Sequence, residues 1–234
     1  MSSGTGKQAP LGKAPRPLRR GRGRPPASAP AGDDLREHVI AASAHVYAEH
    51  GYRHTTVERI LEAAGISRPT FYRLFSDRRD VIEALVARAN DLLYAQVLAA
   101  AEQQRDLRGA VVAAVDAYFE WGLNLGPMVG AIYNEIHDPE SPASSHRARV
   151  IARMIALFDS IAAEHGRPRL DPIFWDALVC AAEHAASGAF WPKRRPPAEI
   201  ERRRAVVLRI LLASLASPRE RVPPLPLYDG APPK

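Results

Sequence analysis

Apolar residues near the start of the regular part of the chain recur at intervals of three and four positions. This spacing places them on one face of a helix, and Asp33 and Asp34 precede them as residues that can cap a helix N-terminus. Gly51 can adopt the left-handed conformation that often ends a helix. The pattern therefore predicts a first helix from Asp34 to Gly51. Its apolar stripe consists of Leu35, Val39, Ala42 and Val46.

A second helix is predicted to open at Thr55, because Thr55 and Glu58 form the Thr-x-x-Glu pattern of a capping box. This helix is expected to end at Gly65, and Ser67 is expected to cap a third, short helix. Residues 34–75 would then hold three short helices, with a three-residue turn between the last two. Such an arrangement, with glycine in the turn, is the pattern of a helix-turn-helix.

The remainder of the chain keeps a helical pattern, broken mainly by proline and glycine. The predicted helices are 78–104, 107–125, 127–137, 142–165, 172–190 and 197–216. No alternating strand pattern accompanies them, so we expect an all-α fold. The expected division is a disordered basic arm (1–32), a three-helix DNA-binding domain (33–77), a helical ligand-binding and dimerisation domain (78–217) and a proline-rich tail (218–234).

Positive charge is concentrated in the arm. The chain carries a formal net charge of +6, yet residues 1–32 hold seven basic residues and no acidic one, so the remainder is close to neutral. A basic arm on a near-neutral body suggests a polyanion as partner. The run from Arg20 to Pro26 resembles an AT-hook, in which Arg22 and Arg24 would enter a narrow minor groove. Non-specific attraction to phosphates and an inert, solubilising tail remain as alternatives.

Several classes of function are disfavoured by the composition and the motifs. The single cysteine, Cys180, excludes a disulfide within the chain, and no Cys/His spacing resembles a zinc site. No apolar run is long enough to span a membrane, and the N-terminus lacks the apolar segment of a signal peptide. The histidines and carboxylates show no catalytic or metal-ligand spacing. We therefore expect a cytoplasmic protein that is not an enzyme and needs neither cofactor nor metal.

A dense, ungapped set of about 45 residues around the predicted helix-turn-helix resembles the TetR family of bacterial repressors. The matching residues are His50-Gly51-Tyr52, Thr55-Thr56-Val57, Ile60, Ala63-Ala64-Gly65-Ile66-Ser67 and Thr70-Phe71-Tyr72-Arg73-Leu74-Phe75. The helices that follow are similar in length and order to the family's ligand-binding domain. The resemblance implies double-stranded DNA as partner, with contacts from Thr56, Ser67, Thr70, Tyr72 and Arg78. Arg78 stands where the family usually has a phosphate-binding lysine.

The third helix has the properties of a recognition helix, which must fit the major groove and present donors to the bases. Its outward residues are expected to be Ser67, Arg68, Thr70, Tyr72 and Arg73, with Phe71 and Phe75 turned into the core. Arg68 is the best candidate for a bidentate contact with guanine, and a phosphate contact is the alternative. Thr55 and Thr56 stand at a predicted helix N-terminus, where backbone N–H groups favour an anion.

The resemblance also assigns roles in the second domain. The family dimerises through its last two long helices, here 172–190 and 197–216, although a fully internal last helix is the alternative. An apolar effector would bind inside the helices from the fourth (78–104) to the eighth (172–190), with Trp121, Met128, Tyr133 and Phe158 as predicted contacts, although any of these can be plain core.

The expected function is thus that of a dimeric repressor that a small molecule releases from a palindromic operator. An activator of the same family and a non-specific architectural DNA-binding protein are the alternatives. A site-specific recombinase would need a strand-rich catalytic domain that the sequence lacks.

Overall fold

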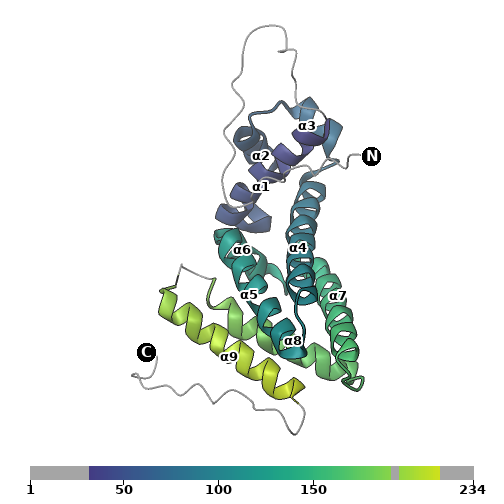
Figure 1. Cartoon of the computed structure of the whole chain (residues 1–234). Helices are drawn as coiled ribbons and strands as arrows, with labels where there is room; N and C mark the ends of the chain where they lie inside the picture. Colours follow the sequence, from purple (N-terminus) through teal and green to yellow (C-terminus); the bar gives the residue numbers. More distant parts are fainter. Residues whose placement is uncertain (1–31, 191–194, 217–234) are drawn as a thin grey trace. The chain divides into compact units, whose positions relative to one another are not determined.

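The computed structural model describes residues 32–190 and 195–216, and every regular element in these ranges is an α-helix (Figure 1). The prediction of an all-α fold is confirmed. In chain order the helices are α1 (Gly32–His54), α2 (Val57–Ala64), α3 (Arg68–Leu74), α4 (Arg78–Glu102), α5 (Leu107–Leu125), α6 (Pro127–Glu135), α7 (Pro142–Glu164), α8 (Pro172–Ser187) and α9 (Pro197–Leu215).

The helices after residue 77 begin where the sequence predicted. Four of them, α6 to α9, open on a proline, whose missing N–H is harmless in a first turn and whose fixed φ suits a helix. Their ends agree less well, and α8 stops at Ser187 rather than at residue 190. In this chain the sequence therefore marks the first residue of a helix more precisely than the last residue.

The start of α2 differs from the predicted capping box. Thr56, not Thr55, is the N-cap residue, and its hydroxyl oxygen accepts a hydrogen bond from the Arg59 N–H at 3.3 Å. Glu58 is then the second helical residue, one place too early to be the partner in a capping box. The prediction was wrong by one residue because two adjacent threonines offer the same cap.

The helices group into two compact units. One contains α1, α2, α3, the first part of α4, α6 and the first turns of α7, and comprises the described residues up to Asp91 together with Asn124–Arg147. The other contains Leu92–Leu123 and the described residues from Ala148 onwards. This division differs from the predicted boundary at residue 77, because α6 packs against α1 and belongs to the first unit.

Glu135, at the end of α6, binds α1. The hydroxyl groups of Tyr47 and Ser141 donate to Oε2 of Glu135, each at 2.8 Å, and the Tyr52 N–H donates to Oε1 at 2.5 Å. Tyr47 is fully buried, and its burial, followed by the nearby Glu135 carboxylate, raises the pKa of its hydroxyl well above the usual range. Tyr47 therefore stays protonated and remains a donor at every physiological pH.

The second unit has its own core. Trp175 packs with Ala162 and Leu178, and its indole N–H donates to Asp159 at 3.2 Å. Partly buried apolar side chains of α7 and α9 cover this cluster. Within the described residues, no helix combines the length and the apolar character that crossing a bilayer requires.

Gly51 allows the close approach of Glu135 to α1. Its backbone has φ 69° and ψ 176°, and a Cβ there would lie 2.9 Å from Oε1 of Glu135. We expect Gly51→Ala to lower the free energy of unfolding by about 1–3 kcal/mol from backbone strain alone, and by more because Glu135 must move. Urea unfolding measures the loss.

Gly166→Ala is the matched control, because Gly166 also has a positive φ of 72°, but a Cβ added there would meet nothing within 4 Å. It should show the backbone cost without the crowding. Equal losses for the two variants would mean that the contact with Glu135 does not restrict residue 51.

Candidate nucleic-acid interface

The turn between α2 and α3 is closed by Gly65. This residue is left-handed (φ 66°, ψ 30°), and its N–H donates to the Glu62 carbonyl at 3.3 Å. The Ile66 N–H donates to the Leu61 carbonyl at 3.2 Å, so the last turn of α2 keeps its carbonyls satisfied. Ser67 then caps α3 as predicted, accepting from the Thr70 N–H at 3.4 Å. Helices α1, α2 and α3 lie together in the upper part of the view (Figure 1).

One side of α3 is buried and the other is exposed. Phe71 and Phe75 retain 0% and 2% of their accessible surface, which confirms that they face the core. The guanidinium group of Arg36 lies over the Phe75 ring, 4.8 Å from its centroid, and covers the core at this edge. Ser67, Arg68, Tyr72 and Arg73 are exposed. The helix therefore presents hydrogen-bond donors on the side opposite its phenylalanines.

The hydroxyl-bearing residues of α3 have local roles as well. The hydroxyl groups of Ser67 and Thr70 are hydrogen-bonded to each other at 2.8 Å. Tyr72 is 48% exposed and rests edge-on against Phe71, with ring centroids 5.4 Å apart. The phenol is thus held by the core at its ring and open to solvent at its hydroxyl end, which suits a contact with a phosphate.

The two arginines of α3 differ in their surroundings. Arg68 forms an ion pair from Nη2 to Oε1 of Glu58 on α2. The pair raises the pKa of Arg68, and the pKa of Glu58 is lowered first by the N–H of its own backbone and then by Arg68. Arg73 is exposed and has no ion pair or side-chain hydrogen bond among the described residues.

Thr55 does not fit its predicted role as a phosphate contact. Its side chain is fully buried, and its hydroxyl donates to the Gly51 carbonyl at 2.7 Å. The residue therefore closes the end of α1 and has no surface to offer to DNA. Thr56 is partly exposed and caps α2, so a contact from Thr56 stays a prediction.

Arg78 is already engaged with the protein. Its Nη1 donates to the carbonyls of Tyr52, Arg53 and Thr55 at 3.1–3.2 Å, and its guanidinium lies 4.5 Å from the centroid of the Tyr52 ring. These carbonyls end α1, so Arg78 neutralises the negative end of that helix. A phosphate contact from Arg78 stays a prediction and would have to use Nε or Nη2.

The predicted effector contacts fall in both units. Trp121, in the second unit, stacks on Tyr118 with centroids 5.8 Å apart, and Phe158 packs against Trp175 in the same unit. Met128 and Tyr133 lie on α6 in the first unit. A hollow of about 560 Å³ in the second unit is lined by none of these four residues. Arg22 and Arg24 lie outside the described residues.

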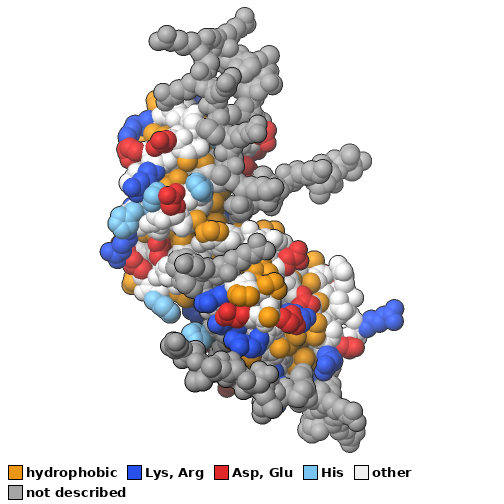
Figure 2. Space-filling model, turned by 90° about the vertical axis from the view of Figure 1, so that its left-hand side faces the viewer, with side chains coloured by type: hydrophobic (Ala, Val, Ile, Leu, Met, Phe, Trp, Pro, Cys, Tyr) orange, Lys and Arg blue, Asp and Glu red, His pale blue; other side chains and the backbone are white. Residues whose placement is uncertain are grey.

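Sequence reasoning missed two residues near this surface. Arg59 is exposed beside the N-terminus of α2, where its Nη1 donates to the His54 carbonyl. Glu58 was assigned to a cap and instead holds Arg68. The face in Figure 2 shows basic, acidic and histidine side chains interspersed over the body rather than one continuous basic band. This mixture agrees with the near-neutral charge of the sequence outside the arm.

Comparison with known proteins identifies the domain that carries this surface. Residues 39–85 match the family model described as "Bacterial regulatory proteins, tetR family". The activator FasR of Mycolicibacterium smegmatis is 31% identical over 89 residues, which are 38% of this chain and 41% of FasR. The repressor LfrR of the same organism is 32% identical over 111 residues, 46% of this chain and 56% of LfrR. The chain thus spans between two fifths and three fifths of these curated relatives.

Solved structures share the fold over most of the chain. A TetR-family regulator from Streptomyces coelicolor has a TM-score of 0.62 at 20% identity, covering 78% of this chain and 82% of that one. FadR from Bacillus subtilis, solved in complex with stearoyl-CoA, has a TM-score of 0.64 at 14% identity, covering 74% of this chain and 96% of its own. At such identities the likeness shows the fold alone.

The burial of Thr55 generates a prediction that separates folding from DNA binding. Thr55→Val keeps the shape of the side chain and removes the hydrogen bond to Gly51, so we expect a loss of about 1 kcal/mol in the free energy of unfolding. The affinity for duplex DNA, measured by fluorescence anisotropy below the unfolding transition, should not change.

Thr56→Val is the comparison, because it removes both a helix cap and the predicted phosphate contact. It should weaken DNA binding as well as stability. A fall in DNA affinity for Thr55→Val as large as that for Thr56→Val would show that the buried hydroxyl matters for binding after all.

Proposed function

The chain belongs to the TetR family of bacterial regulatory proteins, and from this membership we propose that it is a sequence-specific regulator acting as a ligand-released dimeric repressor. The observation that carries the proposal is the two-sided character of α3, with buried phenylalanines behind an exposed row of donors. A helix of this kind fits the major groove, where each base pair presents a distinct pattern of acceptors. The family is one of regulators, in agreement with the expectation that the chain is not an enzyme.

Repression is the simpler of the two regulatory outcomes. A repressor needs only to occupy its operator, whereas an activator needs an additional surface that engages the transcription machinery. The relatives FasR and LfrR are named an activator and a repressor, respectively. The exposed donors of α3 support operator binding, and we propose repression on that ground, in the bacterial cytoplasm where the DNA lies.

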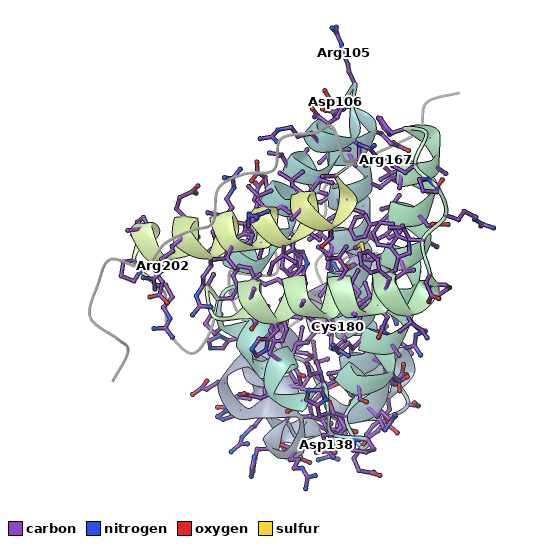
Figure 3. All side chains as sticks on the ribbon, turned by 90° about the horizontal axis from the view of Figure 1, so that it is seen from below. Arg105, Asp106, Asp138, Arg167, Cys180 and Arg202 are labelled. Atoms are coloured by element: carbon purple, nitrogen blue, oxygen red, sulfur yellow. The ribbon has the colours of Figure 1, made fainter. Side chains whose placement is uncertain are left out.

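A homodimer through α8 and α9 is the second part of the proposal. The two helices lie side by side in the second unit, with Cys180 on α8 and Arg202 on α9 (Figure 3). In the single chain Ile173 is 79% exposed and Phe174 is 40% exposed at the start of α8. Ala205 and Ala213 of α9 are exposed as well, so α9 is not fully internal in the single chain. A partner subunit would cover these apolar side chains and place two recognition helices on a palindrome.

The effector is proposed to be a small molecule with a large apolar part. The predicted contacts in the second unit are Trp121 and Phe158. The B. subtilis FadR complex with stearoyl-CoA supports a long-chain acyl-CoA as the first compound to test. Release would follow if the effector binds more tightly to a state whose α3 helices are wrongly spaced for DNA. By resemblance, α4 transmits this change.

Selection of bound duplexes from a random pool tests the function. The expected result is a palindrome whose half-sites lie about one helical turn, or roughly 34–36 Å, apart. Stearoyl-CoA should lower the affinity for this operator in anisotropy titrations, and the protein should reduce transcription from a promoter that contains it.

A scrambled duplex of equal length is the control for that experiment. A pool without any preferred sequence would support the architectural alternative, and increased transcription from the same promoter would support an activator. An operator affinity that no acyl-CoA changes would remove this effector class from the proposal.

Ile173 provides the test of the dimer. Because Ile173 is 79% exposed in the single chain, Ile173→Asp should leave the fold intact while placing a charge in the proposed interface. Burial of an unpaired charge costs several kcal/mol, so we expect monomers in sedimentation equilibrium and at least about a hundredfold weaker operator binding.

Leu123→Asp is the matched control, because Leu123 is also an exposed apolar residue, at 44%, but lies on α5. It should leave the dimer and the operator affinity unchanged. A dimer that persists in Ile173→Asp would place the interface elsewhere.

A further inference from the structure

Glu58 and Arg68 join the two helices of the helix-turn-helix at their solvent side. Glu58 is the second residue of α2 and Arg68 the first residue of α3, and the ion pair runs from Nη2 of Arg68 to Oε1 of Glu58. Both side chains stay accessible, at 52% for Arg68 and 65% for Glu58. The carboxylate therefore lies on the surface that would meet DNA, at a place where a protein that binds phosphates would not be expected to carry an acid.

Glu58 is available for this pair because it does not cap its own helix. Thr56 supplies the cap of α2, and Arg59, not Glu58, stands at the third helical position. The pKa of Glu58 is lowered by its own backbone N–H and by Arg68, so the carboxylate is charged at neutral pH. A negative charge at a helix N-terminus is favourable, which holds Glu58 in place independently of Arg68.

The pair changes what Arg68 can recognise. Arg68 keeps its positive charge, but the Glu58–Arg68 pair as a whole has almost no net charge, so its attraction to a phosphate is weak. Its other N–H donors remain, and O6 and N7 of guanine are neutral acceptors that need directed donors rather than net charge. A guanidinium whose position is fixed on one side also loses less freedom when it binds a base edge.

We propose that Glu58 is a specificity-determining residue that directs Arg68 to a guanine and away from the phosphate backbone. The inference rests on the proposed function, in which α3 enters the major groove. Glu58 acts in two ways: it neutralises Arg68 as a phosphate contact, and its own charge repels the backbone of DNA that lacks the right base. Both effects lower binding to non-specific duplexes more than binding to the operator.

Arg73 is the internal reference for this proposal. It lies on the same helix and is exposed, but among the described residues its side chain has no carboxylate partner. No carboxylate offsets its charge, so it is suited to a phosphate contact. The two arginines should therefore respond differently to salt, because each neutralised phosphate contributes about 0.9 to the slope of log K against log[salt].

The experiment compares the full chain with Glu58→Gln, Arg68→Ala, Glu58→Gln combined with Arg68→Ala, and Arg73→Ala. Each protein is titrated against the selected operator and a scrambled duplex over a range of salt concentrations, after thermal unfolding has verified its fold. Glutamine preserves the size of residue 58 and removes its charge. All the substituted side chains are exposed, so the variants should fold.

Glu58→Gln should bind the scrambled duplex about three- to tenfold more tightly, with a salt slope steeper by about 0.9 per subunit. Its preference for the operator should fall by a similar factor.

Arg68→Ala should lose about tenfold or more in operator affinity with little change in slope, as expected for a base contact. Arg73→Ala should weaken both duplexes equally and make the slope shallower. In the background of Arg68→Ala, Glu58→Gln acts only by removing the repulsion between Glu58 and the DNA backbone. Its effect on the preference for the operator should therefore be smaller than in the presence of Arg68.

An unchanged preference and slope in Glu58→Gln would overturn the proposal. So would equal reductions of slope in Arg68→Ala and Arg73→Ala, because Arg68 would then be a phosphate contact. Failure of the proposed function gives a different result: the unsubstituted chain would not distinguish the operator from the scrambled duplex, and the inference would fall with it.

Discussion

The carboxylate of Glu135 is the group on which the first unit depends. It accepts from the hydroxyls of Tyr47 and Ser141 and from the Tyr52 N–H, and so serves three donors from two distant segments of the chain. A buried donor without an acceptor costs about 1–3 kcal/mol, so these segments have a strong reason to stay together. Tyr52 in turn carries the guanidinium of Arg78 on its ring. The end of α1 and the start of α4 are therefore fixed by one side chain of α6.

This arrangement makes α6 part of the unit that holds the helix-turn-helix. A second link supports the first: Arg53 donates to Asp138 from Nε at 3.1 Å and from Nη2 at 2.9 Å, close to the end of α6. Because packed, hydrogen-bonded contacts have few alternative arrangements, a displacement of α6 must either carry α1 with it or break these bonds. The chain thus has a direct physical route from α6 to the DNA-binding surface, in addition to the continuous helix α4.

The sequence predicted the features that a few neighbouring residues determine. It did not predict the contacts between segments that are far apart in the sequence. The cap at Ser67, the turn at Gly65 and the buried face of α3 each follow from a few neighbouring residues, and the structure has all three. The capping-box pattern favoured Thr55, which has Glu58 three residues on, whereas the N-cap is Thr56, so the local pattern selected the wrong threonine. Glu135 meets Tyr52 across 83 positions of the sequence, and no periodicity or motif marks such a contact.

The charged residues of this chain would serve two purposes: attraction to any DNA, and discrimination between DNA sequences. Arginines of the body are often paired with carboxylates, as Arg53 is with Asp138 and Arg68 with Glu58, whereas the basic residues of 1–32 have no acidic neighbours in the sequence. Paired arginines add little to the long-range field, because opposite charges a few ångströms apart cancel at a distance of one Debye length, about 8–10 Å. Non-specific attraction to DNA would then come mainly from the arm. The selection of a DNA sequence would come from the body, whose net charge is close to zero. A near-neutral recognition surface discriminates better than a basic one for a physical reason: a strong charge would hold the protein equally on every sequence.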